Sequence, residues 1–412
     1  MLRYFRQISA DYRWSFLGTS VLALTQLLQM IIAARLLLPA ELGMWAVLMM
    51  LYRLLTPLVE AVNRAVIREK SLVQTQIDTL FSLNVLSGLS AAVLLFILAD
   101  AVSQFFYLDG SDFYFGVFSL IFIVIGLGTL RGSLLQKDLQ FRKLATIQVF
   151  ASLCEFALFL VLLLQGWRLW SLLLAFMLRF SIQHLSYLIF SGYSVRFGCN
   201  INSIRPIIGF GKYDLGAQLL NYFYTNIDNI LVGRLLGQTA LGYYALAWDI
   251  TVKPVSFFNP VILRVAFPLM AKASNVKKLY IEALKKVALV QLPVYSLLAL
   301  LMYPLIALVY GQQWTPSAGP AVVLCGVALL RALAEPGASV LAVKGRVDFE
   351  FYFQFLNILV TVLSIFLFYY LKPEISSISF AMLLAHVLLM SYWFRWIWKH
   401  LIQSESPALQ HK

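Results

Sequence analysis

Apolar runs of about 20 residues follow one another along almost the whole of this 412-residue chain, with short polar connections between them. A helix needs about 20 such residues to cross roughly 30 Å of hydrocarbon. Backbone N–H and C=O groups in lipid must pair within the protein, and a barrel would show shorter, alternating segments. The runs therefore predict an all-α integral membrane protein.

The composition excludes most other classes. Apolar residues make up 61% of the chain and charged residues only 12%, whereas a soluble domain has about a quarter of its residues charged. The three cysteines form no CxxC motif and no Cys/His pairing at metal-ligand spacing. A soluble globular, disordered or disulfide-stapled protein does not fit this sequence.

We expect twelve transmembrane helices. The first run is too long for the apolar core of a signal peptide, so we interpret it as an uncleaved span. The predicted ranges are 14–37, 42–66, 79–101, 113–135, 144–166, 169–191, 214–236, 241–266, 284–309, 318–343, 350–371 and 376–398.

Lys and Arg are distributed unevenly between the two sides that these helices define. Segments on the side of the N-terminus hold 24 of the 32 basic residues, and segments on the opposite side hold four. Cytoplasmic loops are enriched in Lys and Arg, so both termini are predicted to be cytoplasmic. The expected location is a bacterial cytoplasmic (inner) membrane.

The two halves of the chain resemble each other. Residues 34–47 read ARLLLPAELGMWAV and residues 233–246 read GRLLGQTALGYYAL, an offset of 199. Six helices per copy give both copies the same orientation, which is a known plan for transporters. We predict an N-terminal lobe at 1–200, a C-terminal lobe at 201–400 and a cytoplasmic tail at 401–412.

Several charged residues fall within predicted helices, where a charge costs about 2.5–3.5 kcal/mol at the bilayer centre. Arg53 and Lys253 occupy near-equivalent places in the two copies. Asp249 lies four residues before Lys253, and Arg331 lies four residues before Glu335. Each such pair could simply neutralise itself, or the cations could line a cavity that binds an anionic headgroup.

We predict that Arg53 and Lys253 bind a pyrophosphate group in such a cavity. The predicted residues of this substrate-binding cavity are Arg53, Lys253, Arg331, Asp249, Asp228 and Glu60. Two other features have structural explanations: a salt bridge between Arg179 and Glu155, and close helix packing at Gly128 and Gly132.

Motifs in a fixed order resemble one known family over roughly residues 5–395. They include RGSLLQKDLQFRKLA, NIDNILVGRLLGQTALGYYALAWDI, VYGQQWTPSAGPAVVLCGVALLRAL and LAVKGRVDF. The chain resembles the Wzx-type oligosaccharide flippases of the multidrug/oligosaccharidyl-lipid/polysaccharide superfamily, in a subgroup like that for colanic acid or lipopolysaccharide. The resemblance implies two six-helix lobes and transfer of undecaprenyl-pyrophosphate-linked glycan to the outer leaflet by alternating access.

The resemblance also implies a charged cavity, at Arg53 and Lys253 with Asp228 as a further candidate. No cofactor is expected, and transport is expected to be coupled to a proton or sodium gradient. Expected partners are the polyprenyl-pyrophosphate-linked glycan, membrane lipids and the polysaccharide polymerase machinery, with no nucleic acid.

Other functions stay open at this point. A related drug/cation antiporter would favour acidic residues in mid-helix, and a lipid II flippase would carry extra helices. A membrane glycan polymerase or ligase would need long outer loops or paired catalytic acids. We therefore predict a transporter for surface polysaccharide biosynthesis and not an enzyme.

Overall fold

The computed structural model describes residues 2–69, 71–108, 110–252, 254–255, 270 and 275–402. All regular structure in these ranges is helical, which confirms the predicted all-α class. The chain divides into two compact units, Met1–Leu219 and Leu220–Lys412, here called unit 1 and unit 2. The boundary falls inside a helix, whereas the lobes predicted from sequence divide at residue 200.

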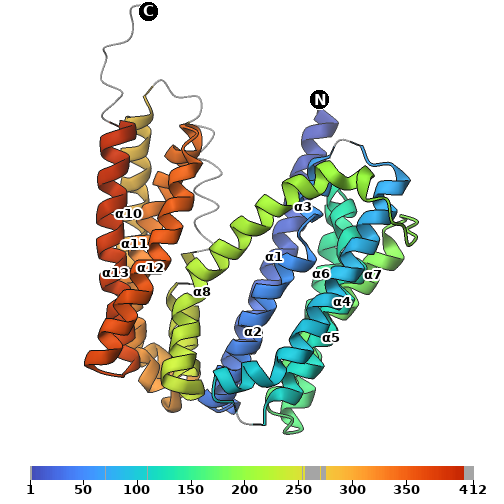
Figure 1. Ribbon diagram of the computed structural model, residues 1–412. Coiled ribbons are helices and arrows are strands. Elements are labelled where there is room, and N and C mark those ends of the chain that lie inside the picture. The colour runs from blue at the N-terminus through green and yellow to red at the C-terminus, as the bar shows by residue number, and fades with distance from the viewer. Residues whose placement is uncertain are drawn as a thin grey trace, which may run out of the picture. The chain divides into compact units, whose positions relative to one another are not determined.

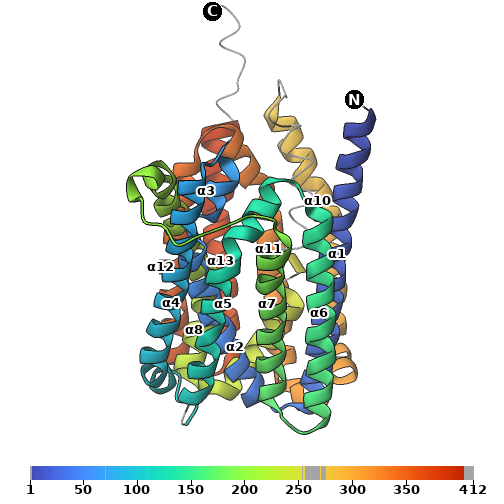
Figure 2. The ribbon, with the colours of Figure 1, turned by 90° about the vertical axis from the view of Figure 1, so that its right-hand side faces the viewer.

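Unit 1 is a bundle of long helices that run side by side (Figures 1 and 2). Its close pairs are α4 with α5, α5 with α7, α6 with α7, and α1 with α6. Its helices are α1 (Leu2–Leu36), α2 (Pro39–Val59), α3 (Asn63–Arg68), α4 (Gln74–Phe105), α5 (Asp112–Lys137), α6 (Phe141–Leu164), α7 (Leu169–Phe190) and the first part of α8 (Ile201–Thr251).

Unit 2 is built in the same manner around α11, which packs on α10 and α13, while α12 packs on α13. Its elements after α8 are α10 (Val276–Leu305), η1 (Ile306–Tyr310), η2 (Gln312–Ser317), α11 (Ala318–Val343), α12 (Val347–Leu371), α13 (Ile375–Ile397) and η3 (Trp398–Ile402).

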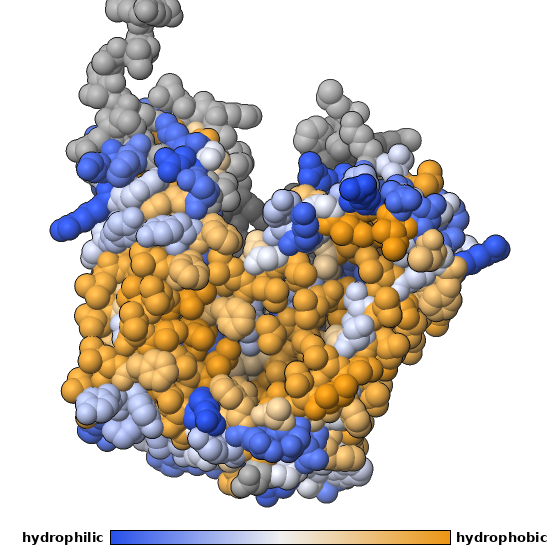
Figure 3. Space-filling model, in the orientation of Figure 1, coloured by the Kyte–Doolittle hydropathy of each residue, from blue (hydrophilic) through white to orange (hydrophobic). Residues whose placement is uncertain are grey.

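Ten helical segments of the described chain are long and apolar enough to cross a membrane. In each unit, apolar side chains cover the middle of the visible face and hydrophilic ones gather near the helix ends (Figure 3). Many large apolar side chains are exposed, as expected where lipid rather than water is the solvent. The chain is a multi-pass membrane protein.

The chain reverses its direction within the segment labelled α8. Gly237 has φ 83° and ψ −179°, which is not helical. The hydroxyl of Tyr244 donates to Asp228 at 2.8 Å, although 16 residues of straight helix would span about 24 Å. The chain therefore turns back at Gly237, as the predicted ends of helices 7 and 8 require. Leu38, in the two-residue connection between α1 and α2, lies 199 positions earlier, which matches the repeat.

Two predicted boundaries were wrong. The predicted helix at 42–66 ends at Val59, and a separate short helix, α3, begins at Asn63. The predicted connection between 191 and 213 becomes helical at Ile201. Ile204 and Ile207 on this stretch are buried against α3 and α4, so apolar packing stabilises the extra helix.

Glycines allow α5 and α7 to approach closely, as predicted. A Cβ at Gly128 would lie 2.4 Å from the backbone oxygen of His184. A Cβ at Gly132 would lie 2.8 Å from the ring of Tyr187. These contacts fix the position of the α7 face that carries His184 and Tyr187.

The predicted Arg179–Glu155 salt bridge is confirmed. Arg179 Nε lies 2.9 Å from Glu155 Oε2, and both side chains are buried. The guanidinium also lies 4.2 Å from the centroid of the Phe180 ring. Pairing removes the need to expose either charge to lipid, so this pair joins α6 to α7.

Candidate functional site

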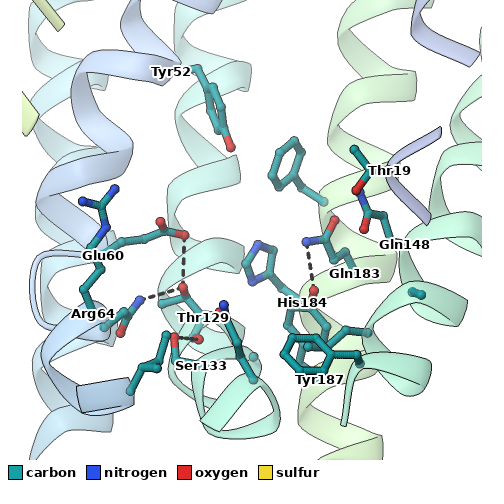
Figure 4. A pocket seen from close by; sticks show the side chains of 18 residues that line it. Thr19, Tyr52, Glu60, Arg64, Thr129, Ser133, Gln148, Gln183, His184 and Tyr187 are labelled. Atoms are coloured by element: carbon teal, nitrogen blue, oxygen red, sulfur yellow. Dashed lines mark hydrogen bonds between the residues drawn. The ribbon is translucent and has the colours of Figure 1, made fainter. Parts of the chain in front are cut away.

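The site begins at the break between α2 and α3. Pro57 has no N–H, so it cannot donate to the carbonyl of Arg53 and weakens the helix at this point. The helix ends two residues later, and the N–H of Glu60 closes its last turn on the carbonyl of Thr56 at 3.0 Å. The segment between the two helices turns Glu60 toward the inside of the bundle (Figure 4), and Asn63 at the start of α3 lines the same cavity.

A cavity of about 590 Å³ lies behind this break. Its wall comes from α1, α2, α3, α5, α6 and α7, and all its lining residues belong to unit 1. This volume is within the range of about 300–1,000 Å³ that is typical of small-molecule sites.

A chain of hydrogen bonds fixes the α2–α3 side of the cavity. The hydroxyl of Thr129 donates to Glu60 Oε1 at 3.1 Å. The Asn63 amide donates to Thr129 Oγ1 at 2.9 Å, and the Asn84 amide donates to Asn63 Oδ1 at 3.1 Å. One carboxylate is therefore oriented by a network of neutral side chains from α3, α4 and α5.

The opposite wall is the face of α7 that carries Phe180, Gln183, His184 and Tyr187. These positions have the i, i+3, i+4, i+7 spacing of one helix face. The Gln183 amide donates to the Tyr187 hydroxyl at 3.0 Å. Figure 4 shows His184 between the Glu60 side and the Gln183 side of the cavity.

His184 has an unsatisfied ring nitrogen. Its side chain is 4% exposed, and Nδ1 has no hydrogen-bond partner among the described residues. Buried polar atoms are nearly always paired, and leaving one unpaired costs about 1–3 kcal/mol. The wall of the cavity thus contains a buried polar atom whose hydrogen-bonding capacity no described residue uses.

Charges at the cavity nearly cancel. Glu60 supplies one carboxylate, and Arg64 is the only Arg or Lys among the described lining residues. Arg64 lies 3.1 Å from Asp214 on the first part of α8, so its charge is already paired. The cavity is consequently polar without being strongly cationic.

The cavity lies toward one end of the bundle. Its α5 residues, Thr129 and Ser133, are close to the C-terminal end of that helix at Lys137. Its α6 residues, such as Gln148, follow soon after the helix begins at Phe141. The distribution of basic residues predicts that this end is cytoplasmic.

The predicted site residues of unit 1 have different positions. Glu60 lines the cavity. Arg53, one turn before Pro57, has an exposed side chain and is not among the residues that line it. The predicted role of Arg53 in binding pyrophosphate stays a prediction.

In unit 2, Asp228 is buried beside Tyr244 and Asn229. It accepts from the Tyr244 hydroxyl at 2.8 Å and from the Asn229 amide at 3.3 Å. Arg331 interacts electrostatically with Asp228 and lies 4.9 Å from the centroid of Tyr224. The structure thus brings two predicted residues together, Asp228 and Arg331.

The structure describes one of the other two predicted residues of unit 2. Asp249 is half-buried near the end of α8. Lys253 lies outside the described residues. Their predicted role in substrate binding stays a prediction.

Sequence reasoning missed most of the cavity. Gln148, Gln183, His184 and Tyr187 were not predicted as site residues, although the last three share the spacing of one helix face. A polar stripe along an otherwise apolar helix was the available signal.

The class of protein follows from these features: a bundle of membrane helices with a polar cavity inside one unit is typical of a transporter.

Solved structures share the fold. An inward-facing multidrug resistance MATE family transporter of the MOP superfamily aligns with a TM-score of 0.72 at 14% identity, covering 95% of this chain and 98% of its own. The lipid II flippase MurJ aligns with a TM-score of 0.79 at 14% identity, and the alignment covers 94% of this chain and 87% of MurJ.

The family is shown by sequence. Residues 32–319 match the family described as "Polysaccharide biosynthesis protein". The match covers more than half of the chain, so the chain belongs to this family.

Two curated relatives are similar over most of the chain. The teichuronic acid biosynthesis protein TuaB of Bacillus subtilis (strain 168) is 29% identical over 308 residues, which cover 73% of this chain and 64% of TuaB. The lipopolysaccharide biosynthesis protein WzxC of Escherichia coli (strain K12) is 28% identical over 355 residues, which cover 83% of this chain and 71% of WzxC. The chain thus spans a little less than two thirds of TuaB.

Proposed function

We propose that this protein translocates a lipid-linked oligosaccharide from the inner to the outer leaflet of the bacterial cytoplasmic membrane. The observation that carries the proposal is the polar unit 1 cavity within apolar membrane helices, in a member of the polysaccharide biosynthesis protein family. The product would supply surface polysaccharide biosynthesis.

The polar glycan is the part of the substrate that is hardest to move across the hydrocarbon of the membrane. Each hydroxyl moved from water into hydrocarbon without a partner costs several kcal/mol. A cavity lined by amides and hydroxyls replaces the hydrogen bonds of water and removes most of this cost. The apolar surface of the helices meanwhile leaves the lipid tail in contact with lipid.

The location of the cavity fits loading from the cytoplasm. It lies near the helix ends that are predicted to be cytoplasmic, where a lipid-linked oligosaccharide made inside the cell would arrive. The pyrophosphate would be held elsewhere, by Arg53 and Lys253 as the sequence predicts. Alternating access driven by a proton or sodium gradient would then carry the lipid-linked oligosaccharide across the membrane.

The experiment measures the leaflet that holds the lipid-linked oligosaccharide. Spheroplasts with and without the gene are treated with periodate, which does not cross the membrane, and oxidised glycan is quantified by mass spectrometry. We expect oxidation in the wild type and protection in the deletion strain, reversed by a plasmid copy. Equal oxidation in both strains would overturn the proposal, and so would equal protection.

Curated relatives include a protein named as a succinoglycan biosynthesis transport protein, ExoT of Rhizobium meliloti (strain 1021), at 22% identity. Its name supports a transport role over the glycan polymerase or ligase considered from sequence. A drug/cation antiporter would instead give drug sensitivity in the deletion strain with normal glycan exposure.

A further inference from the structure

We propose that the unit 1 cavity is a saccharide site that holds one or more sugar rings of the transported glycan by direct contact. This inference rests on the proposed function. It assigns the glycan to this cavity and separates it from the site of the pyrophosphate.

The hydrogen-bonding groups of the cavity match a sugar. A sugar hydroxyl both donates and accepts hydrogen bonds. The side-chain amides and hydroxyls of a protein also do both. Three glutamines line the cavity, Gln136, Gln148 and Gln183, together with the hydroxyls of Thr19 and Ser133. The amides of Gln136 and Gln148 make no hydrogen bond to any described residue, so they can be used by a ligand.

The aromatic groups match the other property of a sugar ring, its apolar C–H faces. Tyr52 and Phe180 meet with ring centroids 5.2 Å apart. His184 lies 5.9 Å from Phe180 and 5.6 Å from Tyr187. These rings form an apolar surface with polar atoms at its edges, on which a flat ring with equatorial hydroxyls can pack.

The unpaired Nδ1 of His184 is the observation that points most directly to a ligand. The nitrogen is buried, lies on a lining residue and lacks a partner in the described chain. Its surface is almost fully covered, so a ligand hydroxyl reaches it only when the ring turns, and can then donate to it or accept from it, whichever tautomer is present.

Charge argues against a pyrophosphate in the same place. Phosphate sites gather several Arg or Lys donors. Here Glu60 contributes a carboxylate, and the charge of Arg64 is paired with Asp214. A neutral polyhydroxyl ligand meets no such repulsion, and a carboxylate such as Glu60 is a strong acceptor for its hydroxyls.

The test is calorimetric titration of the full-length protein in detergent micelles. The probe is the free oligosaccharide released by mild acid from the polyprenyl-linked repeat units of the host strain. Inorganic pyrophosphate and maltotriose are titrated separately. Variants are Gln148→Leu and Gln183→Leu, and the matched control is Gln165→Leu, an exposed glutamine after α6 that does not line the cavity.

We expect the wild type and Gln165→Leu to bind the oligosaccharide with the same Kd. Each cavity variant should weaken binding about 3- to 10-fold, because one hydrogen bond to the ligand is lost. Glu60→Gln keeps the shape and should weaken binding by a similar or larger factor. Melting temperatures measured in the same buffer identify any variant that fails to fold.

Three results would overturn the site: equal affinity in the cavity variants and the control, pyrophosphate binding that the cavity variants reduce, or tighter binding of maltotriose than of the host oligosaccharide. The leaflet measurement described above tests transport separately. Translocation with unaltered binding in the variants would reject the saccharide site alone. Binding that depends on Gln148 and Gln183 without translocation would reject the transport function alone.

Discussion

Asp214 lies 3.1 Å from Arg64, so an ion pair between residues 150 positions apart ties the first part of α8 to the edge of the unit 1 cavity. The Arg64 side chain is 63% exposed and that of Asp214 is 13% exposed. An exposed pair of this kind contributes at most about 1 kcal/mol to stability. The pair therefore matters more for the charge at the cavity, where it neutralises Arg64, than for the stability of the fold.

Asp214→Asn should leave the Arg64 guanidinium uncompensated at the cavity. We expect a decrease of less than about 1 kcal/mol in the free energy of unfolding. We also expect weak binding of inorganic pyrophosphate that the wild type does not show, detected by calorimetry at low salt. Exchanging the two residues, Arg64→Asp with Asp214→Arg, should restore stability and abolish that binding. Strong destabilisation by the single variant would contradict the assignment of an exposed pair.

Glu155→Gln should destabilise unit 1 strongly. The Arg179 charge would stay buried without its carboxylate partner, a change that costs about 3–5 kcal/mol in proteins. Thermal melting in detergent micelles measures the loss. Glu374→Gln is the control, because the Lys372–Glu374 pair is exposed and its loss should cost less than about 1 kcal/mol. Similar melting temperatures for the two variants would show that the Glu155 pair adds little.

Gly128→Ala should separate α5 from α7. The added Cβ would lie 2.4 Å from the His184 oxygen, and such overpacking costs about 1–3 kcal/mol. Binding of the oligosaccharide should fall as well, because the displaced α7 face carries His184. Gly116→Ala on the same helix is the control. Its Cβ would meet the Phe96 ring at 3.6 Å, an ordinary contact, so melting temperature and binding should be unchanged or slightly improved.

Tyr244→Phe should weaken the helical hairpin at Gly237. The buried Asp228 carboxyl would lose the hydrogen bond that the Tyr244 hydroxyl donates to it, and a bond to a charged group contributes about 1.5–3 kcal/mol. Tyr280→Phe is the matched control, since Tyr280 is also buried in unit 2 and its hydroxyl makes no hydrogen bond to a described residue. Chemical denaturation in micelles should place the control near the wild type, and equal loss in both variants would refute the role of the Asp228 bond.

Alkaline phosphatase fusions test the predicted orientation. A fusion after Gln312 should be active, because this residue begins the span Gln312–Val343 on the side with few basic residues. A fusion after Lys137, at the end of α5, should be inactive. The reverse pattern would place the cavity near the outer leaflet and would contradict loading from the cytoplasm.

The helices could be predicted from sequence because hydropathy and length decide which segments cross a membrane. The reversal at Gly237 was also predictable, since a repeat copies the position of a turn. The break after Pro57 was only partly predictable. A proline removes one hydrogen bond, but tertiary contacts of Asn63 and Glu60 decide whether the helix kinks or ends.

The site was harder to predict because only charged residues contrast strongly with an apolar sequence. A buried charge is expensive in lipid, so Arg53, Arg331 and Asp228 stand out in the sequence. Neutral polar residues such as Gln148 and Gln183 cost much less, and many of them merely bond to neighbouring backbone. Only the packing of α6 and α7 shows that these two line one space.

The unit 1 cavity is formed by a single compact unit, and this has a thermodynamic consequence. A ligand shifts a conformational equilibrium only by the difference between its affinities for the two states. If unit 1 keeps its shape, a sugar held wholly inside it has the same affinity in both states and exerts no such bias. Recognition of the glycan and the free energy that reorients the protein must then come from different groups, so variants of the cavity should change which glycan is carried more than how fast the empty protein cycles.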